Sequence, residues 1–145
     1  MTVIQHCWWQ ILVAAIAYFA LGALWFNPKT FGTAWANSHG VKMDPEKRKE
    51  INMGKMFGLS FLCGLLISAV IAWVVYATCC GDSCMTHSLM HCLKIGFMIG
   101  AAVAAGLAMN HIYLMKPSAA FYIDGGYHIV GGMIVAAVLH FTCCC

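Results

Sequence analysis

The sequence predicts an all-α membrane protein, a bundle of four transmembrane helices that forms a single membrane domain over residues 1–145. Two observations lead to this prediction. Hydrophobic residues make up 62% of the chain and charged residues only 9%, whereas about a quarter of the residues in a soluble domain are charged. Four apolar segments also approach or exceed the roughly 20 helical residues that cross a bilayer core of about 30 Å. A β-barrel is not expected, because the sequence lacks the alternation of apolar and polar residues that its strands need.

The four spans are predicted over residues 3–26, 56–77, 95–115 and 118–141, and the first three contain no charged residue. The first span lacks a basic leading region and is longer than the apolar part of a signal peptide, so we expect it to be retained. The fourth is too short if it begins at Gly125, but a start near Pro117 makes it long enough. Proline is tolerated in the first turn of a helix. This start places Asp124 roughly two turns inside the helix.

The orientation is predicted from the loop between the first two spans, residues 27–55, because basic loops tend to stay in the cytoplasm. Six of the eight basic residues lie there: Lys29, Lys42, Lys47, Arg48, Lys49 and Lys55. We therefore expect this loop to be cytoplasmic and both termini to lie on the non-cytoplasmic side. The loop also explains the net charge of +3, so nucleic acid is not an expected partner.

Cysteines gather on the predicted non-cytoplasmic side, mainly in the cysteine-rich loop of residues 78–94 and at the C-terminus. In an oxidising compartment they would form disulfides. With neighbouring histidines they would instead suit a soft metal such as Cu or Zn, although nothing in the sequence requires a metal. If the topology is inverted, the three cysteines at the end of the chain become candidates for palmitoylation. The candidate disulfide or metal ligands are Cys7, Cys79, Cys80, Cys84, His87, His91, Cys92, Cys143, Cys144 and Cys145.

A layer of polar side chains is predicted inside the membrane where the last two spans form a hairpin. Asn110 lies seven residues before Pro117 and Asp124 seven residues after it, so both should lie at a similar depth. An ionisable group at such a depth is a functional candidate by default. Either Asp124 accepts hydrogen bonds that pin the hairpin, or the layer relays a proton or cation through its histidines. The predicted layer consists of Asn110, His111, Tyr113, Asp124, Tyr127 and His128.

Two segments resemble a known family. The stretch "GALWFNPKTFGTAW" and the stretch "FYIDGGYHIVGGMIVAA" are similar to the opening and closing motifs of the DUF1761 family of membrane proteins. The resemblance covers nearly the whole chain and implies a small four-span membrane protein, but it brings no activity. The cysteine-rich loop and the "CCC" ending lie outside the family pattern. The resemblance marks as family-type positions Trp25, Pro28, Phe31, Gly32, Trp35, Asp124, Gly126 and Tyr127.

The small size and the lack of a soluble domain favour a non-catalytic structural or accessory subunit of a homo- or hetero-oligomeric membrane complex. The expected partners are therefore the lipid bilayer, further copies of the chain, or other subunits. One alternative is an ion or small-solute transport component that uses Asn110, His111 and Asp124. Another is an exoplasmic thiol or soft-metal handling protein, although the CxxC pair of a thiol oxidoreductase is missing. Motifs for hydrolysis or phosphoryl transfer are absent, so we do not expect an enzyme.

Overall fold

The computed structural model describes residues 8–41, 52–79 and 88–143, and these residues form five helices and no strand. The four long helices are α2 (Trp8–Trp25), α5 (Met53–Cys79), α6 (Leu89–Tyr113) and α7 (Ser118–Cys143). Each is long and apolar enough to cross a membrane. The prediction of an all-α bundle with four transmembrane helices is therefore confirmed. The fifth helix, α3 (Gly32–Ser38), is short and follows α2.

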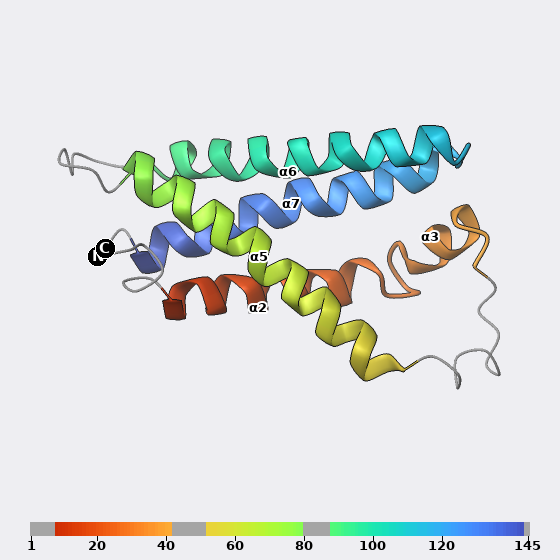
Figure 1. The fold of residues 1–145 in the computed structure, drawn as a ribbon, viewed down its shortest axis with the longest axis horizontal. Helices are drawn as coiled ribbons and strands as arrows, with labels where there is room; N and C mark the ends of the chain where they lie inside the picture. Colours follow the sequence, from red (N-terminus) through yellow and green to blue (C-terminus); the bar gives the residue numbers. More distant parts are fainter. Residues whose placement is uncertain (1–7, 42–51, 80–87, 144–145) are drawn as a thin grey trace.

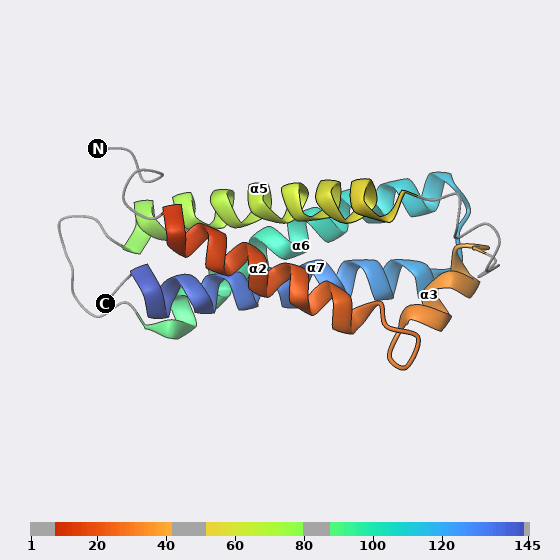
Figure 2. The same cartoon turned by 90° about the horizontal axis from the view of Figure 1, so that it is seen from below.

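The helices alternate in direction along the chain, and α6 and α7 lie side by side as an antiparallel hairpin (Figures 1 and 2). Helix α2 packs against α7, and α5 packs mainly on α2. Helix α3 lies at the end of the bundle where α7 begins, and it contacts α7. The bundle therefore has an α3 end, where α6 turns into α7, and an opposite end, where α5 and α7 finish.

The α6–α7 hairpin is close because glycines face one another across it. A Cβ atom added to Gly100 would lie 2.5 Å from the carbonyl oxygen of His128, and one added to Gly96 would overlap the carbonyl oxygen of Gly132. Small residues at such spacing let two helix backbones approach one another. Gly54 and Gly58 on α5 have the same spacing, but they do not bring two helices together, since a Cβ at Gly58 would meet nothing within 4 Å.

The apolar core fills the half of the bundle away from α3. Its fully buried side chains come from all four long helices, with Ala14 on α2, Ile71 on α5, Cys92 on α6 and Val135 on α7. Toward the α3 end, α5 diverges from the other helices, and residues 53–59 at its start are all exposed. This divergence leaves space between α2 and α5.

Helix α3 is positioned by a compact turn after α2. The hydroxyl of Thr30 donates to the carbonyl oxygens of Leu24 and Trp25 at 2.6 and 2.9 Å, which satisfies acceptors that the end of α2 leaves unpaired. Glycine is required at Gly32, because a Cβ there would lie 2.7 Å from the carbonyl carbon of Asn27. The turn sends α3 back toward the start of α7.

Candidate functional site

The carboxylate of Asp124 is the centre of a polar cluster at the α3 end of the bundle. Its Oδ1 accepts a hydrogen bond from the indole Nε1 of Trp35 at 2.8 Å. Its Oδ2 lies 3.1 Å from Nε2 of His39 and 3.2 Å from Nε2 of His111. Three elements therefore converge on one carboxylate: α3 with the residue that follows it, the end of α6, and the second turn of α7.

The His39 ring is fixed by contacts within its own segment. It stacks on Trp35 with ring centroids 4.6 Å apart and an interplanar angle of 28°. Its Nδ1 lies 3.0 Å from the carbonyl oxygen of Trp35 and 3.3 Å from the hydroxyl of Ser38. Gly40, with φ +66°, follows in the left-handed conformation that glycine tolerates best. The segment thus holds the ring with Nε2 directed at Asp124.

The contact between His39 and Trp35 favours one tautomer of the ring. A carbonyl oxygen only accepts hydrogen bonds, so Nδ1 bonds to the Trp35 carbonyl only when it carries the proton. A neutral imidazole then has an unprotonated Nε2, whose lone pair faces the Oδ2 atom of Asp124. Two lone pairs at 3.1 Å repel each other unless a proton or a metal cation lies between them. Histidines that bind metals characteristically donate from the other ring nitrogen to a carbonyl in this way.

The cluster is largely shielded from solvent. The side chains of His39, His111 and Asp124 are 10%, 9% and 15% exposed. A carboxylate in such surroundings is costly unless a positive group or several donors face it. Nδ1 of His111 is buried and has no hydrogen-bond partner among the described residues. Among the described residues, the polar contact of that ring is therefore the one between its Nε2 and Asp124, while its edge packs against the His39 ring.

The spacing of the cluster suits a metal ion. One candidate ligand atom from each of His39, His111 and Asp124 lies within 4.8 Å of the other two. In a tetrahedral zinc site with bonds of about 2.0–2.1 Å, neighbouring ligand atoms are about 3.3 Å apart. The two N–O separations of 3.1 and 3.2 Å are close to that value. Two imidazoles and one carboxylate are also a ligand set that divalent transition metals accept.

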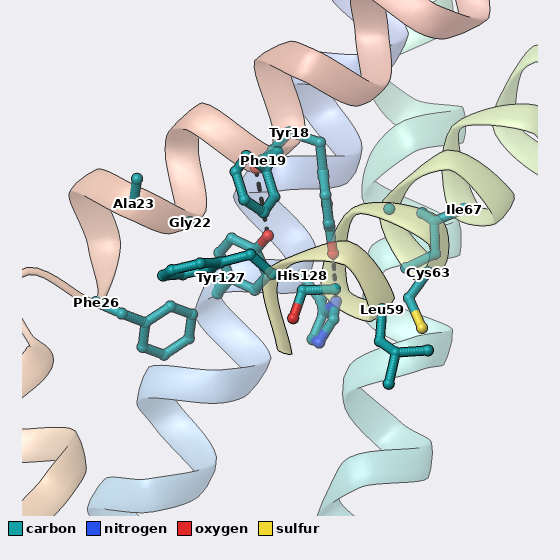
Figure 3. Close-up of a pocket in the computed structure, with 13 residues that line it drawn as sticks. Tyr18, Phe19, Gly22, Ala23, Phe26, Leu59, Cys63, Ile67, Tyr127 and His128 are labelled. Carbon is teal, nitrogen blue, oxygen red and sulfur yellow. Dashed lines mark hydrogen bonds between the residues drawn. The ribbon is translucent and has the colours of Figure 1, made fainter. Parts of the chain in front are cut away.

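A second polar cluster lies deeper in the bundle, one turn further along α7. The hydroxyl of Tyr18 on α2 lies 2.6 Å from Nδ1 of His128, and the hydroxyl of Tyr127 donates to the backbone carbonyl of Tyr18 at 3.3 Å. The two tyrosine rings are in contact, with centroids 5.0 Å apart. Figure 3 shows the three side chains meeting at one side of a pocket between α2, α5 and α7.

The comparison with known families decides the identity of the chain. The model of the family described as "Protein of unknown function (DUF1761)" matches residues 9–140. The chain belongs to the DUF1761 family. No curated protein and no solved structure matches it. Membership therefore places this DUF1761 protein in a family without an established activity.

Several positions that resemble the DUF1761 motifs meet where α3 approaches α7. The indole of Trp25 donates to the carbonyl of Ile123 at 3.1 Å, one residue before Asp124, and its ring packs against Phe31 with centroids 4.8 Å apart. A Cβ at Gly126 would lie 3.3 Å from the Trp25 ring, so the absence of a side chain there makes room for the indole. Both tryptophans of the first motif thus donate hydrogen bonds to α7.

The structure divides the predicted polar layer into separate groups. His111 and Asp124 are in contact, whereas Tyr127 and His128 belong to the deeper cluster with Tyr18. Asn110 and Tyr113 are exposed on the outer face of α6, and Tyr113 is 80% exposed. The described contacts therefore bring four of the six predicted residues into two clusters.

Most of the cysteine cluster lies outside the described residues, namely Cys7, Cys80, Cys84, His87, Cys144 and Cys145. Cys79 and Cys143 are the last residues of α5 and α7, and their side chains also lie outside the description. Of the remaining two, His91 is exposed, and Cys92 is buried with its sulfur 3.7 Å from Nδ1 of His140. The proposed disulfides or soft-metal site remain predictions.

Sequence reasoning did not identify His39 or Tyr18 as site residues. His39 follows Trp35 by four residues, a spacing that places two side chains on one face of a helical turn. This spacing was the sequence signal that could have grouped His39 with Trp35. Tyr18 gives no comparable signal, because it lies 110 residues from His128 in the sequence and within an apolar run.

Proposed function

We propose that this DUF1761 protein binds one divalent transition-metal ion through His39, His111 and Asp124. The ion would tie α3 and the end of α6 to α7 at the α3 end of the bundle. The observation that carries the proposal is that two imidazole Nε2 atoms face the same carboxylate oxygen, at 3.1 and 3.2 Å. In the absence of an ion, a proton would have to lie between each Nε2 atom and the carboxylate oxygen.

The surroundings of the three side chains support the proposal. The contact between His39 Nδ1 and the Trp35 carbonyl leaves Nε2 free to bind a metal, and the Trp35 indole orients the carboxylate through Oδ1. Three protein ligands leave a fourth position of a tetrahedral ion for water or another molecule. The proposal concerns binding and assigns no catalytic step.

Titration of the purified full-length protein with Co²⁺ tests the proposal. Co²⁺ bound by nitrogen and oxygen gives weak visible d–d bands, whereas cobalt bound by cysteine adds an intense sulfur-to-metal charge-transfer band. This difference separates the proposed site from the cysteine cluster. We expect d–d bands without charge transfer, and an affinity that falls at least about ten-fold in His39→Gln, His111→Gln and Asp124→Asn.

The matched control is His91→Gln, since His91 is exposed on α6 and lies outside the proposed site. This variant should bind Co²⁺ as the wild type does. Asp124→Asn retains the size of the side chain and its ability to accept from Trp35, so its loss of binding would not require loss of the fold. The proposal fails if the d–d bands are absent, or if they persist unchanged in the His39 and His111 variants.

A second candidate function is that of an accessory subunit in a membrane complex. In such a complex the outer face of α5 would be the contact surface, because five of its large apolar side chains are more than half exposed. These are Leu59, Leu62, Leu66, Val70 and Trp73. A photo-crosslinking amino acid at Leu66, in native membranes, should give a protein adduct, whereas the same probe at Met98 on the outer face of α6 should give lipid adducts. Lipid adducts at both positions would remove this candidate.

A further inference from the structure

A pocket of about 650 Å³ lies between α2, α5 and α7 (Figure 3). His39, His111 and Asp124 are not among the residues that line it. It is located where α5 diverges from the bundle, and its walls are mainly apolar and aromatic. Phe19 comes from α2, Phe26 directly follows α2, and Phe57 comes from α5. Pockets that bind small molecules have about this volume and the same mixture of apolar walls with a few polar groups.

The polar side of the pocket is formed by Tyr18 and His128. Tyr18 is held in place, because its ring lies directly on Gly131, where a Cβ would overlap it. Its hydroxyl is bonded to Nδ1 of His128 at 2.6 Å. No described residue forms a hydrogen bond with Nε2 of His128. When the Tyr18 hydroxyl donates to Nδ1, a neutral imidazole carries its proton on Nε2 and has a donor to offer.

The position of the pocket limits what can reach it. His128 lies about 15 Å along α7 from Ser118, at 1.5 Å per residue, and half of a bilayer core is also about 15 Å. Two residues that line the pocket, Phe57 and Leu59, are 48% and 54% exposed on the apolar outer surface. The pocket therefore extends from His128, near the middle of the membrane, to Phe57 near the start of the predicted span 56–77. Its exposed side faces the lipid, from which a ligand would enter.

We propose that this pocket binds a lipid-soluble molecule whose planar ring carries a carbonyl oxygen, the chemistry of a quinone head group. The carbonyl accepts a hydrogen bond from Nε2 of His128, and the ring packs against Phe19, Phe26 and Phe57. Aromatic walls favour a flat ring in offset or edge-to-face contact. A plain hydrocarbon chain would leave the imidazole donor buried and unpaired, which is unfavourable. The inference concerns binding only, and it does not depend on the metal site.

Photoaffinity labelling in lipid nanodiscs tests the inference with one probe and two competitors. The probe is a decyl-substituted azidoquinone, and the competitors are decylubiquinone and decylbenzene, which has a ring but no carbonyl. We expect the probe to label residues of the pocket. Decylubiquinone should compete at least ten-fold more effectively than decylbenzene.

Two variants change the pocket in different ways. His128→Leu removes the hydrogen-bond donor, and Cys63→Trp fills space at the α5 wall, where Cys63 is exposed and lines the pocket. Each should weaken competition by decylubiquinone at least ten-fold, whereas the control His91→Leu, outside the pocket, should leave it unchanged. Circular dichroism establishes that each variant is folded. Equal competition by the two compounds, labelling outside the pocket, or unchanged binding in Cys63→Trp would overturn the inference.

Discussion

Replacing Trp35 with phenylalanine tests whether Asp124 is held in place as a metal ligand. The substitution keeps an aromatic ring that can contact His39 and Phe26, whose ring centroids lie 4.6 and 5.7 Å from that of Trp35. It removes the Nε1–H group that donates to Oδ1 of Asp124 at 2.8 Å. The carboxylate then loses the donor that orients it, while both imidazoles remain.

The magnitude follows from the kind of hydrogen bond that is lost. Loss of a partner that orients a metal ligand lowers metal affinity about 10- to 100-fold, which corresponds to about 1.4–2.7 kcal/mol. Trp25→Phe is the matched control, because Trp25 also donates to α7 but to the neutral carbonyl of Ile123, at 3.1 Å. That loss should lower the free energy of unfolding by about 0.5–1.5 kcal/mol and leave metal affinity within about two-fold.

The assay is competition for Zn²⁺ between each purified variant and a chromophoric chelator, with the thermal unfolding of each protein measured in the same detergent. We expect Trp35→Phe to bind Zn²⁺ more weakly than both the wild type and Trp25→Phe. Equal zinc affinities in the two variants would refute the reasoning, because the indole of Trp35 would then have no part in orienting a ligand.

Further predictions concern packing, acidity and orientation. Gly96→Ala should lower the free energy of unfolding by about 1–3 kcal/mol because the added methyl group overlaps the α7 backbone. Gly106→Ala on the same helix should leave the free energy of unfolding unchanged or raise it, since nothing lies within 4 Å of the added carbon. Equal free energies of unfolding for the two variants, measured by denaturation, would contradict the described hairpin. Lowering the pH from about 7.5 to about 5.5 should weaken Co²⁺ binding, since metal and protons compete for the imidazoles; spectra that do not change with pH would argue against histidine ligands. Cys84 lies outside the described residues, in the loop predicted to face the side opposite to the cytoplasmic loop 27–55. It should therefore react with an impermeant maleimide in intact cells after reduction and chelation. Reaction only after permeabilisation would reverse the predicted orientation.

The transmembrane helices were predictable because crossing a bilayer depends mainly on segment length and apolar composition. The contact between His111 and Asp124 was also accessible, since both residues lie on one hairpin whose turn is marked by Pro117. The grouping of Asn110 and Tyr113 with them was not reliable, because successive residues on a helix are rotated by about 100°. When His111 faces Asp124, its neighbour Asn110 points elsewhere, and both Asn110 and Tyr113 are exposed.

The contributions of His39 and Tyr18 depend on long-range packing that hydropathy does not encode. His39 reaches Asp124 only because the turn after α2 sends α3 back onto α7. Tyr18 meets His128 because Gly131 leaves space for its ring. In both cases the decisive partner lies on a helix distant in the sequence.

X-ray absorption at the zinc edge, on the protein loaded with one equivalent of Zn²⁺, tests the central claim most directly. If the ion is bound by His39, His111 and Asp124, we expect a shell of nitrogen and oxygen atoms at about 2.0–2.1 Å. The spectrum should also show the outer-shell scattering of two imidazole rings. This imidazole scattering should be lost in the double variant His39→Gln and His111→Gln. A shell dominated by sulfur at about 2.3 Å, unchanged in the double variant, would contradict the claim and assign the metal to the cysteines.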